Sequence, residues 1–206
     1  MVAMQRYLDG RIAIITGGFS GIGKAIALAL AERGATIAVG ARRQPAAIVE
    51  ELEAASDRCF FHRLDVGSVD SIAEFVEALA ARHGNADILV NSAGVTAHEF
   101  VCGHDEQSWL DVIDINLSGP FRMIRACLPA MKARNWGRII NIGSTAATTA
   151  TADHAAYCAS KSGLLGLNRA VALEGAPHGV SSTVISPTWV QTEMFDSSMK
   201  IQAQKA

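Results

Sequence analysis

Short apolar runs alternate along the chain with longer segments in which apolar and polar residues recur at helical spacing. Several of the short runs are almost unbroken in apolar residues, which is typical of parallel strands buried on both faces. The predicted strands are Arg11–Thr16, Thr36–Gly40, Cys59–Leu64, Asp87–Asn91, Arg138–Ile142 and Val180–Ile185. The predicted helices are Gly21–Arg33, Pro45–Ala55, Ser68–His83, Asp105–Arg134 and Tyr157–Glu174.

This alternation of strands and helices predicts an α/β fold. It indicates a doubly wound parallel sheet of about six strands with helices on both faces. The chain shows no internal repeat and no Pro/Gly/Ser-rich linker, so residues 1–206 are predicted to form a single domain. In an open sheet of this kind a ligand binds outside the carboxyl ends of the strands. The functional residues are therefore expected at that edge.

Composition and charge exclude some classes of function. A formal net charge of −2, a pI near 6.3 and the lack of a basic tract argue against nucleic-acid binding. The chain lacks an apolar run of about 18 residues, so no membrane-spanning helix is predicted. Its first eleven residues do not have the cationic and then apolar plan of a signal peptide. We therefore expect a cytoplasmic protein.

Two groups of potential metal or redox ligands give weak signals. The four cysteines lie far apart, form no CxxC pair, and are predicted to be buried free thiols: Cys59, Cys102, Cys127 and Cys158. A second group has spacing that matches no metal motif: His98, Glu99, His104 and Asp105. We expect this second group to form a solvated loop, and we predict no metal site.

A glycine-rich segment follows the first predicted strand directly. It reads Thr-Gly-Gly-Phe-Ser-Gly-Ile-Gly over residues 16–23, and a helix begins within it. Glycine permits a sharp turn and a close approach of the backbone to a ligand, while a helix N-terminus offers free N–H groups and a positive dipole end. A pyrophosphate suits such a position, although any tight strand–helix turn also favours glycine.

Tyr157 and Lys161 stand four positions apart, so on a helix they lie on the same face about one turn from each other. A tyrosine has a pKa of about 10, and lowering it by about three units requires about 4 kcal/mol. A cation about 5 Å away, at an effective dielectric constant of about 20, supplies roughly 3 kcal/mol of this. The pair is therefore a candidate for proton transfer, although an exposed Tyr–Lys pair on a helix is also common.

Taken together, five separated motifs resemble the short-chain dehydrogenase/reductase family, in particular its 3-oxoacyl-reductase-like branch. They are TGxxxGIG, the Asn-Ser-Ala-Gly run at residues 91–94, Asn116, Ser144 and YxxxK. The interval of 13 positions from Ser144 to Tyr157 is the family's usual spacing. The resemblance covers the chain from Leu8 to about Met194 and implies a Rossmann-type fold.

The resemblance implies four catalytic residues. Tyr157 would be the general acid/base, and Lys161 would lower its pKa and hydrogen-bond the nicotinamide ribose. Ser144 would hold the substrate oxygen, and Asn116 would position a water that links Lys161 to solvent. Two structural alternatives stay open: Ser144 can cap a turn, and Asn116 can be a helix residue bonded to backbone.

The resemblance also implies the cofactor site. Its expected residues are Gly17, Ser20, Gly21, Ile22, Gly23, Arg42, Asp65, Val66, Asn91, Ala93, Gly94, Tyr157, Lys161, Pro187, Val190 and Thr192. The family position that bears an acidic residue in NAD-preferring members falls on Ala41, and Arg42 and Arg43 follow it. Guanidinium groups suit a 2′-phosphate, so NADP is favoured and NAD stays possible. The alternatives are a solvated turn for the two arginines and a helix N-cap for Asp65, a role that suits Ser68 better.

The sequence departs from the family at two turns. Ser92 replaces an Asn, a change that is expected to preserve its turn. Thr188 replaces the Gly that usually follows Pro187, so it is expected to avoid positive φ. The substrate pocket is expected to be small and moderately polar, with residues Thr96, Ala146, Thr151 and His154. His154 is predicted to be a pocket wall, with a second acid/base as the alternative.

These observations favour an NADP-dependent oxidoreductase that interconverts an uncharged carbonyl and a secondary alcohol. The alternative is a catalytically idle nucleotide-binding scaffold or regulatory subunit. Residues 195–206 are expected to begin a truncated or mobile substrate loop, which leaves the sixth strand as an unpaired edge. We expect a homodimer or homotetramer that associates through the helices Asp105–Arg134 and Tyr157–Glu174.

Overall fold

The computed structural model describes residues 6–205, without the side chains of residues 202, 204 and 205. It has one six-stranded sheet of order β3-β2-β1-β4-β5-β6, in which every pairing is parallel. Its strands are β1 Ile12–Thr16, β2 Thr36–Ala41, β3 Cys59–Arg63, β4 Ile88–Asn91, β5 Gly137–Ile142 and β6 Val180–Ile185. Each predicted strand is present within one residue at either end, which confirms the doubly wound parallel fold.

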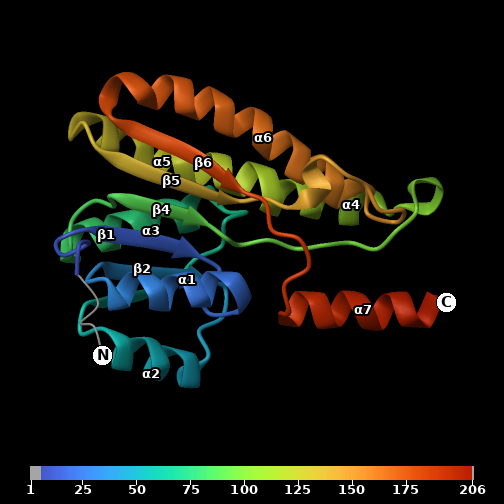
Figure 1. Ribbon diagram of the computed structural model, residues 1–206, viewed down its shortest axis with the longest axis horizontal. Helices are drawn as coiled ribbons and strands as arrows, with labels where there is room; N and C mark the ends of the chain where they lie inside the picture. Colours follow the sequence, from blue (N-terminus) through green and yellow to red (C-terminus); the bar gives the residue numbers. More distant parts are fainter. Residues whose placement is uncertain (1–5, 206) are drawn as a thin grey trace.

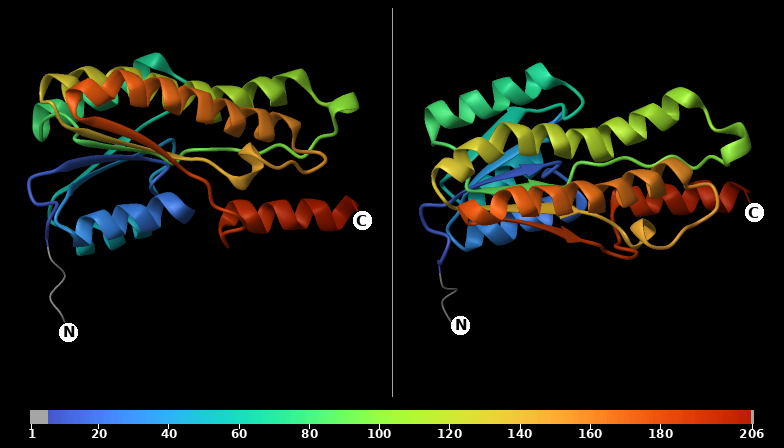
Figure 2. Two further views of the ribbon diagram at one scale, coloured as in Figure 1. Left: turned by 45° about the horizontal axis from the view of Figure 1, so that its top comes forward. Right: turned by 90° about the horizontal axis from the view of Figure 1, so that it is seen from above.

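Helices cover both faces of the sheet (Figure 1). Their bounds are α1 Gly21–Glu32, α2 Ala46–Ala55, α3 Val69–Arg82, α4 Glu106–Ile113, α5 Gly119–Ala133, α6 Ala155–Gly175 and α7 Glu193–Lys205. The helices α1 and α2 lie on one face, and α3, α5 and α6 lie on the other (Figure 2). Among residues 6–205 no helix is both long enough and apolar enough to cross a membrane.

The two faces of each central strand belong to different hydrophobic clusters. Ile14 of β1 packs with α3, α5 and α6, whereas its neighbours Ala13 and Ile15 pack with α1 and α2. Successive side chains of a strand point to opposite faces, so a strand covered on both faces needs apolar residues at every position. This explains why the apolar runs are almost unbroken.

The long helix predicted over Asp105–Arg134 is wrong as a single element. The chain forms α4, then a π-helical turn at Asp114–Ser118, then α5. Such turns interrupt the regular i to i−4 hydrogen bonding and often occur at functional sites. Here the turn carries Asn116, which is only 1% exposed. The hydrophobic periodicity continues across the turn, so the sequence pattern did not reveal the break.

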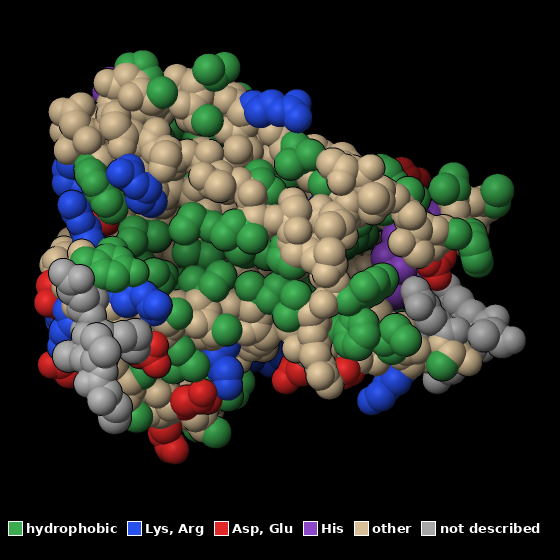
Figure 3. Space-filling model, in the orientation of Figure 1, with side chains coloured by type: hydrophobic (Ala, Val, Ile, Leu, Met, Phe, Trp, Pro, Cys, Tyr) green, Lys and Arg blue, Asp and Glu red, His purple; other side chains and the backbone are tan. Residues whose placement is uncertain are grey.

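The C-terminal part leaves the sheet. The edge strand β6 pairs only with β5, and the chain then crosses to α7, which lies beyond the carboxyl ends of the strands (Figure 1). The segment where a substrate loop was expected to begin is therefore helical. On the face of Figure 3 hydrophobic side chains form a band across the middle of the molecule. A shallow groove on the α1 side of the sheet includes Ile26, Leu30, Ile140 and Ile185, and Ile185 is 49% exposed.

All four cysteines are free, and the prediction that they are buried is only partly right. Cys127 is buried, Cys59 and Cys158 are half-buried, and Cys102 is exposed. Burial raises the pKa of Cys59 to about 11 and that of Cys127 to about 12. Cys59 and Cys127 are therefore almost entirely protonated at neutral pH.

Candidate active site

A cleft of about 950 Å³ lies along the carboxyl edge of the sheet. Residues at or just after the ends of β1, β2, β3, β4 and β5 line it, together with the β6–α7 connection and the start of α7. Every predicted cofactor residue lines this cleft except Asn91, and so do three of the four predicted catalytic residues. The exception among the catalytic residues is Asn116.

The backbone atoms of the turn after β1 lie so close to neighbouring atoms that the turn requires glycine. Gly17 has φ +67°, and a Cβ there would lie 2.9 Å from the Cα of Ala93. A Cβ on Gly23 would lie 2.5 Å from the carbonyl oxygen of Gly17. The Ser20 side chain makes no capping hydrogen bond at the N-terminus of α1. This narrow turn and open helix end fit the pyrophosphate of a dinucleotide.

The turn after β4 is fixed by two neighbouring strands. The Thr16 hydroxyl accepts hydrogen bonds of 3.1 Å from the backbone N–H groups of both Ser92 and Ala93. Asn91 lies behind this turn, where its amide donates 2.8 Å to Asn141 within the buried sheet. Asn91 therefore supports the turn from beneath instead of facing the cleft. Thr16 was not singled out from the sequence, although it opens the TGxxxGIG motif.

The first turns of α6 place Tyr157 and Lys161 at the cleft wall. The Lys161 Nζ lies 5.6 Å from the Tyr157 ring centroid and donates a 2.7 Å hydrogen bond to the backbone oxygen of Ile142. Burial lowers the pKa of Lys161 to about 8. Burial also raises the pKa of Tyr157, and a hydrogen bond with Ser144 opposes this increase. That Lys161 lowers this pKa stays a prediction.

Ser144 follows the end of β5 and has two contacts. Its Oγ accepts a 3.1 Å hydrogen bond from the backbone N–H of Ala146, which caps the short 3-10 turn Thr145–Ala147. The same side chain hydrogen-bonds Tyr157. The turn-capping alternative and the contact with the candidate acid/base therefore both hold.

Asn116 links three elements through its side chain. Its Oδ1 accepts from the backbone N–H of Val95 at 2.8 Å, and its Nδ2 donates to the backbone oxygen of Val95 at 2.8 Å. Nδ2 also lies 3.2 Å from the Ser160 hydroxyl of α6. The side chain is thus engaged with backbone, as in the structural alternative, and it ties the turn after β4 to the helix that carries Tyr157.

Arg42 and Arg43, both exposed, line the end of the cleft near β2 and β3. Asp65 also lines the cleft and accepts a 3.0 Å hydrogen bond from the backbone N–H of Gly67. Ser68 caps α3 by accepting from the backbone N–H of Ser71 at 3.2 Å. The N-cap role therefore belongs to Ser68, as expected.

The end of the cleft near α7 contains residues from distant parts of the chain. The four predicted pocket residues all line the cleft, namely Thr96, Ala146, Thr151 and His154. His154 is 8% exposed and lines the cleft, and its role as a pocket wall stays a prediction. Trp189 and Phe195, whose rings lie 5.7 Å apart, also line the cleft, as does Ser198. Sequence reasoning missed all three; for Phe195 and Ser198 the reason is that residues 195–206 were expected to begin a loop.

One expectation about this end of the cleft is only partly right. The segment that contains His98 and His104 was predicted to be a solvated loop. Their side chains are only 3% and 8% exposed. His98 packs against His154, with 4.3 Å between the two ring centroids. Tertiary contacts therefore bury these two imidazole rings, whereas residues 100–103 and Asp105 are exposed, as a solvated loop would be.

Known proteins are similar to this chain in both sequence and fold. The family model of the short chain dehydrogenases matches residues 11–203. A D-beta-hydroxybutyrate dehydrogenase of Cupriavidus necator is 38% identical over 200 residues, which cover 96% of this chain and 78% of that one. The 3-oxoacyl-(acyl-carrier-protein) reductase FabG of Escherichia coli is 37% identical over 188 residues, covering 90% and 76%.

Among solved structures, a variant of actinorhodin polyketide ketoreductase with NADPH superimposes with a TM-score of 0.91. It is 35% identical in sequence, and the match covers 95% of this chain and 76% of that one. The resemblance inferred from the five motifs is thus confirmed over nearly the whole chain. The protein belongs to the short-chain dehydrogenase family and is an oxidoreductase by descent.

Proposed function

We propose that this chain interconverts a carbonyl and a secondary alcohol with NADP as its cofactor. The observation that carries this proposal is the contact between Ser144 and Tyr157 at the wall of a cleft whose other end is the glycine turn. A phenol and a hydroxyl on one wall can both hydrogen-bond the same substrate oxygen. The buried ammonium of Lys161 lies on the same wall.

Different residues of the cleft would hold different parts of the cofactor. Gly17, Gly21 and Gly23, with the N-terminus of α1, would hold the pyrophosphate, since a Cβ at Gly17 or Gly23 would close the turn. The turn after β4 and the segment that includes Pro187, Val190 and Thr192 would hold the nicotinamide end. When bound, the nicotinamide supplies or accepts the hydride.

Residues of the protein transfer the proton. In the direction of reduction, Tyr157 donates its phenolic proton to the carbonyl oxygen, while Ser144 donates a hydrogen bond that keeps this oxygen in place. In oxidation the phenolate accepts the proton from the alcohol. The Lys161 ammonium stabilises the phenolate electrostatically. Asn116 would position the water through which the proton reaches solvent.

Cofactor preference depends on the end of β2. Ala41 ends the strand where a carboxylate would repel a 2′-phosphate, and Arg42 and Arg43 beside it line the cleft. Guanidinium groups form two-pronged hydrogen bonds with phosphate. We therefore propose NADP over NAD.

The substrate end favours an uncharged group. The cleft there is lined by small or moderately polar side chains and by the aromatic pair Trp189–Phe195. One relative named above acts on 3-oxoacyl groups, which are uncharged around the carbonyl, whereas the D-beta-hydroxybutyrate of the other carries a carboxylate. We propose a small ketone or a 3-oxoacyl derivative as the substrate.

We further propose that copies of the chain associate through the helices on the α6 side of the sheet. Exposed apolar side chains on these helices support this proposal, namely Leu110, Phe121 and Leu173. Light scattering after size-exclusion chromatography would give the mass. A monomer at micromolar concentration would contradict the proposal.

A binding titration of the 206-residue chain with NADPH and NADH, followed by a panel of carbonyl compounds, tests the proposed function. We expect tighter binding of NADPH and its oxidation in the presence of at least one ketone. Binding without turnover of any carbonyl or alcohol would favour the idle scaffold. Binding of neither nucleotide would contradict both.

A further inference from the structure

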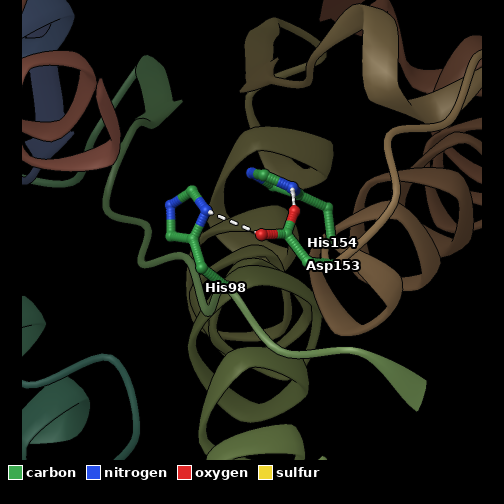
Figure 4. Close-up of side chains that lie close together, drawn as sticks. All are labelled: His98, Asp153 and His154. Atoms are coloured by element: carbon green, nitrogen blue, oxygen red, sulfur yellow. Dashed lines mark hydrogen bonds and ion pairs between the residues drawn. The ribbon is translucent and has the colours of Figure 1, made fainter. Parts of the chain in front are cut away.

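Three potential metal ligands meet at the wall of the cleft: His98, Asp153 and His154 (Figure 4). His98 comes from the segment after β4, and the other two directly precede α6. Each offers one ligand atom, and these atoms lie within 4.8 Å of one another. Their side chains are 3%, 9% and 10% exposed. The sequence had grouped His98 with Glu99, His104 and Asp105, whereas folding brings it to two residues more than 50 positions away.

The carboxylate of Asp153 faces both imidazole rings, one oxygen toward each (Figure 4). Its Oδ1 lies 2.7 Å from Nδ1 of His154, and its Oδ2 lies 3.9 Å from Nδ1 of His98. The longer distance exceeds the length of a hydrogen bond. It is close to the separation of about 3.4 Å between two ligand atoms on a tetrahedral zinc ion. The shorter distance is a hydrogen bond, which an ion bound between the three ligands would replace.

His98 also has the outer contact that metal-binding histidines usually have. Its Nε2 lies 3.0 Å from the hydroxyl of Ser198 on α7. With its hydrogen on Nε2, His98 donates to Ser198 and directs the lone pair of Nδ1 toward Asp153. A partner of this kind fixes the ring orientation and tautomer of a ligating histidine.

The backbone holds the cluster in place. Asp153 has φ +63°, a left-handed conformation that is uncommon for a residue other than glycine. Its carbonyl oxygen accepts a 2.8 Å hydrogen bond from the backbone N–H of Glu99, next to His98. Unusual backbone conformations persist where the surroundings fix them and often mark functional sites. This backbone hydrogen bond joins the segment that carries His98 to the segment that carries Asp153 and His154, without using their side chains.

We propose that His98, Asp153 and His154 bind one divalent transition-metal ion of the Zn²⁺ class. Two imidazoles and one carboxylate suit Zn²⁺, Co²⁺ or Ni²⁺, whereas Mg²⁺ and Ca²⁺ prefer oxygen ligands alone. Three protein ligands leave a fourth position open. Because His154 and Ser198 line the cleft, this position is accessible to water or to a substrate oxygen. The ion would also tie α7 to the wall of the cleft.

The test uses the full chain without a histidine tag, treated with EDTA and then titrated calorimetrically with Zn²⁺. We expect one equivalent to bind and the unfolding temperature to rise. Asp153→Asn should weaken binding at least about tenfold and abolish the thermal shift. Asparagine also tolerates the left-handed conformation, so this variant keeps the turn. His98→Gln should weaken binding in the same way.

His62→Gln is the matched control, because this histidine lies on β3 with a side chain that is 32% exposed. It should bind Zn²⁺ as the unchanged chain does. Spectra of the Co²⁺ form should lack thiolate charge-transfer absorption, which rules out binding by the cysteines. Absence of Zn²⁺ uptake, or equal uptake by Asp153→Asn, would overturn the proposal. The site does not depend on the proposed dehydrogenase activity, so each can fail alone.

Discussion

The ammonium of Lys161 donates a 2.7 Å hydrogen bond to the backbone carbonyl oxygen of Ile142, the last residue of β5. This bond joins the helix that carries Tyr157 to the strand that precedes Ser144. It also partly compensates the burial of a charged group that is only 6% exposed. The geometry of the candidate proton-transfer residues therefore depends on contacts between α6 and the end of β5.

Tyr157→Phe should lower turnover by about 10²–10⁴-fold, because the phenolic proton is lost while the ring and its packing remain. Cofactor affinity should change little. Steady-state assay and a binding titration separate the two effects. The chain has one other tyrosine, Tyr7, which is 66% exposed, so Tyr7→Phe is the control and should keep full turnover. Undiminished turnover in Tyr157→Phe would remove this residue as the acid/base.

Lys161→Met should change how stability depends on pH. Burial lowers the folded-state pKa of Lys161 to about 8, whereas a lysine in the unfolded chain titrates at about 10.4. Below about pH 8 both states hold the proton, and the buried charge disfavours folding. Between about pH 8 and about pH 10.4 the unfolded chain binds more protons, so stability rises with pH.

The unfolding free energy of the unchanged chain, minus that of Lys161→Met, should therefore increase by up to about 3 kcal/mol across this range. The hydrogen bond to Ile142 favours the charged form and reduces the change. Urea unfolding at several pH values measures the difference. A difference that is constant with pH would show that the pKa of Lys161 is not lowered.

Arg42→Ala should weaken NADPH binding by about 10–100-fold, because it removes hydrogen bonds between charged groups. NADH binding should change little, since NADH lacks the 2′-phosphate. Fluorescence titration with both nucleotides gives the ratio. Arg82→Ala, an exposed substitution at the C-terminal end of α3, is the control. Equal loss of both affinities would indicate a different role for Arg42.

Gly23→Ala should abolish cofactor binding and lower stability, because its Cβ would lie 2.5 Å from the Gly17 carbonyl oxygen. Gly166→Ala is the opposite case. A Cβ there meets no atom within 4 Å, and the position lies within α6, so alanine should stabilise the chain by about 0.5–1 kcal/mol. Nucleotide titration checks Gly23→Ala, and thermal unfolding checks both variants. Tight nucleotide binding by Gly23→Ala would contradict the proposed pyrophosphate site.

The cysteines should react at very different rates. Cys102 is exposed and should be alkylated first, whereas Cys127, buried and with a pKa of about 12, should be the slowest. Time-resolved iodoacetamide labelling with peptide mass spectrometry measures the order. Rapid modification of Cys127 in the folded chain would show that α5 opens readily.

The sequence by itself determined the strands, the parallel sheet and most of the cleft. Strands buried on both faces must be apolar at nearly every position, so runs such as 12–16 and 36–41 can be predicted as strands from the sequence. The positive φ of Gly17 and the close contact of Gly23 with the Gly17 carbonyl are local to the turn after β1, so these glycines also leave a local pattern. Tyr157 and Lys161 lie within one helical turn, so their proximity follows from helix periodicity.

Contacts between distant segments required the tertiary structure. The π-helical turn that contains Asn116 depends on its bonds to Val95, which precedes it by more than 20 positions. His98, Asp153, His154 and Ser198 meet only because the turn after β4, the start of α6 and α7 converge at one edge of the sheet. When segments 50 or 100 positions away bury a polar side chain, the sequence around that side chain carries no signal of the burial. Local backbone preference and hydrophobic periodicity are therefore readable from the sequence, whereas the partners of polar side chains are decided by packing.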